Sequence, residues 1–206
     1  NDSPLRFRAG AAKVCITPTE PFWLAGYASR TAPANGTLSE LYASALALED
    51  ERGVRFVIAS IDLIAVTPTI TRPVIEAARQ RFGLEREQLL LTATHTHYGP
   101  EFRPDKTVFF KIPNEYAAKL PTVADGIAAA IVQAIGLALD SLEPARLFVR
   151  KTSVGFAHNR RRHGVVAGSP SKEDVVDHDV PILYCVGKSG KRIALVFGYA
   201  CHNTTI

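Results

Sequence analysis

Two histidines separated by one residue, His95 and His97, are the side chains in this sequence best suited to chemistry. They follow a short apolar run, residues 89–91, and precede the pair Gly99-Pro100, a pattern typical of a buried strand that ends in a loop. Because side chains on a strand alternate between its two faces, both imidazoles are expected to point into one pocket. Two converging imidazoles suit a divalent metal, most often zinc. The alternative is a hydrogen-bonded pair of loop histidines without a metal.

A third histidine, His202, stands at the end of an apolar run that is expected to form the last strand. A strand end that carries His202 would parallel the strand end that carries His95. Catalytic zinc commonly takes three protein ligands and a water molecule. The sequence therefore offers two well-placed ligands, and the rest of the ligand set is not found among its residues.

A carboxylate inside a predicted buried strand, Asp62, is the next candidate. The segment 54–64 is nearly all apolar, and burying a lone carboxylate is costly without a partner. We interpret Asp62 either as an outer acceptor for a metal-bound histidine or as a residue that caps the following helix or holds a loop.

An aromatic loop, residues 18–36, contains Phe22, Trp23 and Tyr27. Long ordered loops inside compact domains are often binding elements. Together with Tyr98, beside the histidine pair, these aromatic residues are interpreted as walls of a substrate groove. The alternative is a hydrophobic flap that covers the edge of the core.

The elements that must position these residues alternate between strands and helices. Strands are expected within 5–17 and 145–155, hairpins at 41–48 with 54–66 and at 180–186 with 192–201, and helices at 69–82 and 114–142, the last with a break near Pro121. Residue Gly83 is expected to close the first helix. This order predicts an α/β domain with mixed β-sheets, helices packed outside and a metal site at converging strand ends.

Composition excludes several classes of protein. Hydrophobic residues make up 47% and charged residues 21% of the 206 residues, values typical of one folded globular domain. The net charge of +4 is dispersed and does not indicate a nucleic-acid partner, although it favours peripheral contact with an anionic membrane. No run approaches the roughly 18 apolar residues of a membrane span.

The three cysteines, Cys15, Cys185 and Cys201, form no metal-type pair and are expected to be small buried side chains, with no disulfide assigned. The first residues, NDSP, resemble a mature end left after removal of a signal peptide. A secreted or periplasmic location is expected on that basis.

Several short segments, taken in order, resemble the neutral (alkaline, non-lysosomal) ceramidases. They are AG at 9–10 with ITP at 16–18, AGYA at 25–28, SIDL at 60–63, ATHTHYGP at 93–100 and YACH at 199–202. The most specific is ATHTHYGP, and the order and approximate spacing of the others add to it. The resemblance is to the N-terminal part of that family's catalytic domain. Residues 1–206 are therefore expected to be a portion of such a domain, with the remainder lying beyond Ile206.

The resemblance implies a zinc-dependent amide hydrolase that cleaves N-acyl sphingosine (ceramide) to a fatty acid and sphingosine. By position, His95 and His202 match two zinc ligands, and His97 matches an active-site histidine that does not bind the metal. Arg160 matches an active-site arginine. The family's remaining ligands, a Glu and a Tyr, come from later in its chain, so these 206 residues alone are expected to bind zinc weakly and to be poorly active.

The implied chemistry suits these residue types. Zinc lowers the pKa of its water to roughly 7 and so supplies a nucleophile. Residue His97 would donate a hydrogen bond to the oxyanion or shuttle a proton. Arg160 would hold a substrate oxygen or the carboxylate product, whereas its neighbours alone indicate a solvated basic loop.

Two other classes of function stay open. The first is a metallohydrolase acting on another amide or ester, including a barrel in which both histidines of the pair bind metal, although a barrel needs eight strand–helix repeats. The second is a lipid-binding domain that keeps the fold without the metal.

Overall fold

Seven strands form one sheet in the part of the chain that the structure, a computed structural model, describes: residues 5–157, 159 and 175–202. The strands are β1 (Phe7–Cys15), β2 (Tyr42–Asp50), β3 (Arg55–Ile61), β4 (Leu89–Ala93), β5 (Glu143–Ser153), β6 (Asp179–Gly187) and β7 (Arg192–Phe197). Their order across the sheet is β4-β3-β2-β1-β5-β6-β7. The β3–β4 pair is parallel and the other pairs are antiparallel. The predicted α/β fold with a mixed sheet is confirmed.

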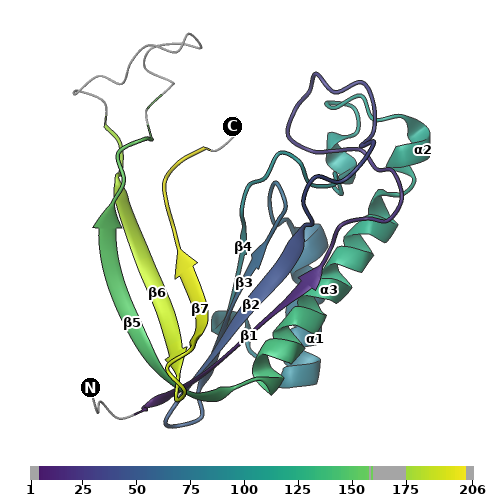
Figure 1. The fold of residues 1–206 in the computed structure, drawn as a ribbon. Coiled ribbons are helices and arrows are strands. Elements are labelled where there is room, and N and C mark those ends of the chain that lie inside the picture. Colours follow the sequence, from purple (N-terminus) through teal and green to yellow (C-terminus); the bar gives the residue numbers. More distant parts are fainter. Residues whose placement is uncertain (1–4, 158, 160–174, 203–206) are drawn as a thin grey trace.

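The sheet is divided into two wings (Figure 1). Strands β1 and β5 pair only through Phe7, Arg8 and Ala9, after which β5, β6 and β7 diverge from the other four strands. The β2–β3 and β6–β7 hairpins are both present where the sequence predicts hairpins. The loops that follow β1 and β4 gather at the end of the molecule opposite the junction of the wings (Figure 1).

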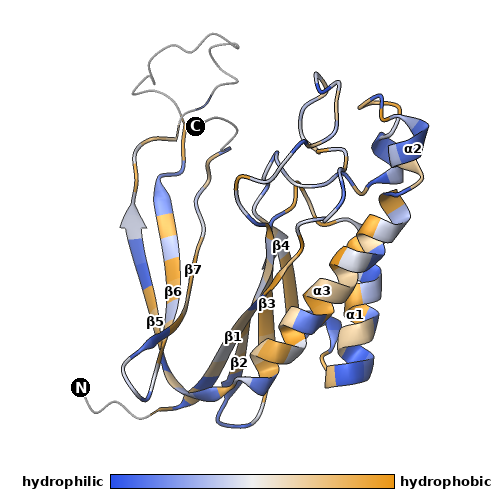
Figure 2. Cartoon of the chain, turned by 45° about the vertical axis from the view of Figure 1, so that its right-hand side comes forward, coloured by the Kyte–Doolittle hydropathy of each residue, from blue (hydrophilic) through white to orange (hydrophobic). Residues whose placement is uncertain are grey.

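Two long helices, α1 (Pro68–Phe82) and α3 (Leu120–Asp140), lie on the same face of β1–β4, and both contain many apolar residues (Figure 2). Helix α1 buries Ile70, Val74 and Ala78, which lie four residues apart and so form one stripe. It ends at Gly83, whose φ of 65° is left-handed and whose N–H bonds the Ala78 and Arg79 carbonyls, as predicted for this glycine.

The long helix α3 (Leu120–Asp140) follows the short α2 (Asn114–Ala117) after a break, close to the predicted position. Among the described residues, Asn114–Asp140 is the one stretch long and apolar enough to cross a bilayer, and it is partly buried. Helix α3 packs on β1, β2 and α1, and its Gly136 lies against the ring of Phe82. This packing accounts for its apolar composition, since a core helix needs the same residues.

The cysteines differ in burial, and no disulfide joins them. Cys185 is fully buried in β6, where burial raises the pKa of its thiol. The expectation of a buried side chain is wrong for Cys15, which is exposed and whose thiol contacts Thr17 and Glu40. Cys201 is half-buried. The alternation of faces at the end of β1 places Cys15 on the open side of the sheet.

Two ion pairs link three neighbouring strands at the end of the sheet opposite the histidines. We call the three side chains, Arg8, Glu49 and Arg55, the charge ladder. Glu49 on β2 stands between Arg8 on β1 and Arg55 on β3 as a cross-strand neighbour of both. The Arg8 guanidinium donates to Oε1 of Glu49 at 2.9 Å, and Nε of Arg55 donates to Oε2 at 2.8 Å. The hydrogen bonds from Arg55 and Arg8 lower the pKa of Glu49 below its ordinary value.

The change Glu49→Gln is expected to lower the free energy of unfolding by roughly 1 kcal/mol at pH 7, a modest value because both arginines are partly exposed and solvent screens the pair. A depressed folded-state pKa contributes stability that is present above the unfolded pKa and is lost as the pH falls through the folded pKa. The difference in urea unfolding between the two proteins should therefore be present at pH 7 and shrink as the pH falls below the ordinary pKa of a glutamate. An equal difference at pH 7 and below that pKa would contradict the ladder's role.

Candidate metal centre

The histidine pair follows the point where two parallel strands end together. Ile61, the last residue of β3, pairs with Ala93, the last of β4, and the Thr94 N–H still donates to the Ile61 carbonyl at 2.9 Å. His95 then has a φ of 60°, a left-handed conformation that is uncommon for residues with a side chain. The predicted reason for convergence, alternation along a strand, is therefore wrong, because β4 has ended. The turn at His95 brings its ring and that of His97 together.

The third histidine arrives on an irregular tail rather than on a strand. Strand β7 ends at Phe197, so the prediction that the strand runs into His202 is wrong. The tail turns where the Cys201 N–H donates to the Tyr199 carbonyl at 2.8 Å. The Tyr199 hydroxyl donates to the Val154 carbonyl at 2.7 Å and accepts from the Ala157 N–H at 3.0 Å, and these bonds fix the tail to the segment after β5.

The three imidazoles converge on one point. The Nε2 atoms of His95 and His202 are 3.1 Å apart, and that of His97 lies 3.3 Å from each. Nitrogen ligands placed about 2.0–2.1 Å from a tetrahedral ion lie about 3.3 Å from one another. The donor set and its spacing therefore fit such an ion, and the cluster of His95, His97 and His202 can hold a metal.

The ring of His95 is oriented by a backbone acceptor. Its Nδ1 lies 2.7 Å from the carbonyl oxygen of Ile64, which can only accept a hydrogen bond, so Nδ1 carries the proton and the Nε2 lone pair faces the cluster. The outer-acceptor role proposed for Asp62 is not found at His95. The Asp62 carboxylate instead accepts from the Tyr42 N–H at 2.9 Å and from the Thr94 hydroxyl at 3.2 Å, which is the loop-holding alternative.

The ring of His97 lies in a tighter environment than that of His95. The residue is 8% exposed, its Nδ1 is buried against the backbone of Gly26, and the ring of Tyr27 meets it edge-on with centroids 4.9 Å apart. Burial lowers the pKa of His97, and its electrostatic interactions with His95, His202 and Arg30 lower it further, against a backbone hydrogen bond at Gly26 that raises it. This imidazole is therefore neutral at pH 7.

The aromatic residues predicted to form one groove are divided between two places. Tyr27 and the exposed Tyr98 flank the histidines. Trp23 is buried in a satellite cluster with Phe110 and Ile112, and with Phe22 it borders a separate hollow of about 370 Å³ beside α3. Backbone pairing separates the two groups of aromatic residues. Residues 23–25 pair with residues 99–101 through an isolated bridge and two hydrogen bonds, and this pairing holds Trp23 away from the histidines. The remaining predicted site residue, Arg160, lies outside the described residues.

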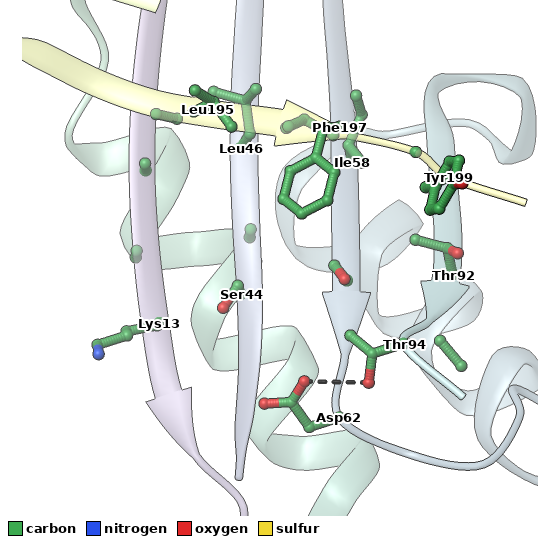
Figure 3. A pocket seen from close by; sticks show the side chains of 18 of the residues that line it. Lys13, Ser44, Leu46, Ile58, Asp62, Thr92, Thr94, Leu195, Phe197 and Tyr199 are labelled. Carbon is green, nitrogen blue, oxygen red and sulfur yellow. Dashed lines mark hydrogen bonds between the residues drawn. The ribbon is translucent and has the colours of Figure 1, made fainter. Parts of the chain in front are cut away.

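A larger groove, of about 1120 Å³, lies between β1–β4 and β7 on the face of the sheet that the helices leave open (Figure 3). Apolar Leu46 and Ile58 line it together with polar Ser44 and Asp62, and Phe197 of β7 closes it from above. Residues 94 and 201, which directly precede His95 and His202, also line it, so the groove opens beside the cluster. The sequence signal for this face is the set of alternate residues along β2 and β3, which mixes apolar and polar side chains.

Residues 7–206 match the protein family described as neutral/alkaline non-lysosomal ceramidase, N-terminal. The chain belongs to this family. Neutral ceramidase A of Dictyostelium discoideum is 25% identical over 190 residues, covering 88% of this chain and 26% of the relative. Neutral ceramidase of Pseudomonas aeruginosa is 24% identical over 213 residues, covering 100% of this chain and 31% of the relative. The chain thus spans about a quarter to a third of the length of these ceramidases.

Solved structures agree with the fold. The crystal structure of neutral ceramidase from Pseudomonas aeruginosa superimposes with a TM-score of 0.78 at 23% identity and covers 96% of this chain and 32% of that one. A structure described as ceramidase complexed with C2 gives a TM-score of 0.77 at 24% identity. The bent sheet with helices on one face is therefore a fold that this chain shares with ceramidases.

Proposed function

We propose that this chain carries part of the active site of a zinc-dependent amide hydrolase that cleaves N-acyl sphingosine (ceramide) to a fatty acid and sphingosine. Membership of the ceramidase family supports the reaction class. The observation that carries the proposal is the convergence of three Nε2 atoms within 3.3 Å of one another, one of them with its lone pair oriented by a backbone carbonyl.

In this proposal His95 and His202 hold the zinc. When bound, zinc supplies a strong nucleophile at neutral pH, because it lowers the pKa of water to about 7. A neutral imidazole at His97 faces the same point and donates a hydrogen bond to the developing oxyanion or moves a proton. Arg160 is assigned the substrate oxygen or the carboxylate product, since its guanidinium is always charged and forked.

The substrate is placed beside Tyr27 and Tyr98, which flank the cluster. Sites for small molecules are mostly apolar with a few placed polar groups, and an N-acyl lipid presents that combination of chemistry. A membrane lipid as substrate suits a secreted or periplasmic protein in peripheral contact with a bilayer, and cell fractionation tests that location.

We also propose that the missing ligands come from polypeptide that the longer relatives contain and this chain lacks. The open face of β1–β4 carries apolar Leu46 and Ile58 in a groove of about 1120 Å³, and removing such apolar surface from water is favourable. Further polypeptide of the same protein would cover this face and reach the histidines, because the groove opens beside them.

The test compares this chain with a longer polypeptide that continues past Ile206 to the length of the relatives. Both are assayed with fluorescent ceramide and with a simple N-acyl amide, and their zinc content is measured. The short chain is expected to bind zinc weakly and hydrolyse neither substrate appreciably, and the longer one to bind about one zinc and hydrolyse ceramide. Full activity of the short chain would refute the shared-site proposal.

Two further outcomes separate the alternatives. A longer polypeptide that cleaves the simple amide and ignores ceramide would keep the amide chemistry and remove the lipid. One that binds ceramide without zinc and without turnover would favour the lipid-binding domain.

A further inference from the structure

A half-buried arginine, Arg30, joins the aromatic loop to the histidine turn. Its guanidinium donates from Nη2 to the carbonyl oxygen of His97 at 2.5 Å. The same group lies 5.2 Å from the ring centroids of both Tyr27 and Tyr98, so it contacts an aromatic pair that flanks the histidines. The contact joins residues 67 positions apart in the sequence.

Arg30 is half-buried, and one of its donor atoms is fully buried. Desolvation lowers the pKa of the Arg30 guanidinium, and its Nε is buried without a hydrogen-bond partner among the described residues. Burying a charged group with an unsatisfied donor costs free energy. The contacts of the guanidinium with the two tyrosine rings and with the His97 carbonyl offset part of this free-energy cost.

The contacts that place the ring of His97 come from the same loop. Gly26 lies against the ring and Tyr27 meets it edge-on, while the Ala25 N–H donates to the Gly99 carbonyl at 2.9 Å. This backbone pairing fixes the loop on one side of His97, and Arg30 fixes it on the other. With Arg30 removed, the ring keeps its neighbours, but the turn that carries it loses a charge-assisted bond.

We propose that Arg30 is a positioning residue for His97: it holds the main chain of His97 so that the imidazole stays directed into the histidine cluster. The effect on turnover rests on the proposed function, whereas the effect on the ring itself does not. Arg30 makes no contact with the Nε2 atoms and is not assigned a chemical step.

The first test measures how accessible the His97 ring is in the metal-free 206-residue chain. Diethyl pyrocarbonate modifies imidazoles at a rate that follows their exposure, and mass spectrometry assigns each site. The ratio of rates for His97 and the exposed His178 serves as the readout. Arg30→Met should raise this ratio about tenfold, the factor that corresponds to losing one hydrogen bond to a charged group. Methionine is chosen because it keeps a long apolar stem beside the two tyrosines and has no hydrogen-bond donor.

Two variants make the result specific. Arg30→Lys should give an intermediate ratio, because an ammonium can still donate to the carbonyl but stacks poorly on two rings. Arg8→Met is the matched control, since Arg8 also donates to a backbone carbonyl, that of Leu142 at 2.9 Å, at the far end of the sheet. It should leave the ratio unchanged. A wild-type ratio in folded Arg30→Met would overturn the proposal, and if that variant does not fold, a wild-type ratio in Arg30→Lys would do so.

The second test is a double-mutant cycle in whichever polypeptide turns over the N-acyl amide. Arg30→Met should lower kcat with little change in KM, and it should add nothing in a His97→Ala background, because both changes then remove the same function. Additive losses would show that Arg30 acts independently of His97. If the unaltered longer polypeptide neither binds zinc nor hydrolyses an amide, the proposed function fails, while the labelling ratios in the 206-residue chain still decide the role of Arg30.

Discussion

Replacing His95 by alanine is expected to abolish zinc uptake, whereas replacing His97 by alanine should leave zinc bound and reduce turnover. The Nε2 lone pair of His95 is directed into the cluster by the 2.7 Å contact between Nδ1 and the Ile64 carbonyl. The ring of His97 is held differently, with its Nδ1 buried against the backbone of Gly26. Loss of a general acid or base lowers turnover about 10²–10⁴-fold, so this range is expected for His97→Ala.

The measurement is equilibrium dialysis against zinc followed by metal analysis, with turnover assayed in the longer polypeptide. His178→Ala is the control, because His178 is exposed and belongs to another part of the chain. It should match the unaltered protein in both readouts. Equal loss of zinc in the His95 and His97 variants would assign all three imidazoles to the metal, an arrangement that the 3.1–3.3 Å spacing also permits. The division of roles would then be wrong, although the metal site would stand.

The sequence predicts those parts of the fold that are determined by residues close to one another in the chain. Helix α1 has an apolar stripe four residues apart and a glycine at its end, and both are visible in the sequence. The β2–β3 hairpin has a turn with Gly53, whose φ is 80°, a conformation that glycine adopts easily. Such features need no knowledge of distant contacts. The bend between the two wings has no such signature, because it arises where β1 and β5 part.

The site was predicted less completely, because distant segments determine it. The chain after β4 turns at His95, and the convergence of the histidines depends on that turn rather than on strand alternation. The acceptor for His95 is a backbone carbonyl, that of Ile64, which no residue type can reveal. Trp23 was assigned to the substrate groove by its type, yet the pairing of its segment with residues 99–101 buries it. The residue types predict which side chains can bind a metal, but they do not predict how the backbone orients those side chains.

Replacing Gly26 by alanine is expected to displace the ring of His97 and to reduce turnover about 10²-fold or more, comparable to losing the imidazole itself. A Cβ atom at Gly26 would lie 2.5 Å from Cγ and Nδ1 of His97, a distance that forces one of them to move. The φ of 98° adds a backbone cost, roughly 1 kcal/mol, for any residue with a side chain. Zinc uptake through His95 should survive the change.

The matched control is Gly53→Ala. Gly53 also has a positive φ, of 80°, but no atom lies within 4 Å of the added Cβ. Gly53→Ala therefore has the free-energy cost of a side chain at positive φ without a steric clash. Urea unfolding should show a larger loss of stability for Gly26→Ala than for Gly53→Ala, and labelling of His97 by diethyl pyrocarbonate should rise only in the former. Equal effects of the two substitutions would mean that the ring of His97 moves aside freely, and that the loop does not hold it in place for chemistry.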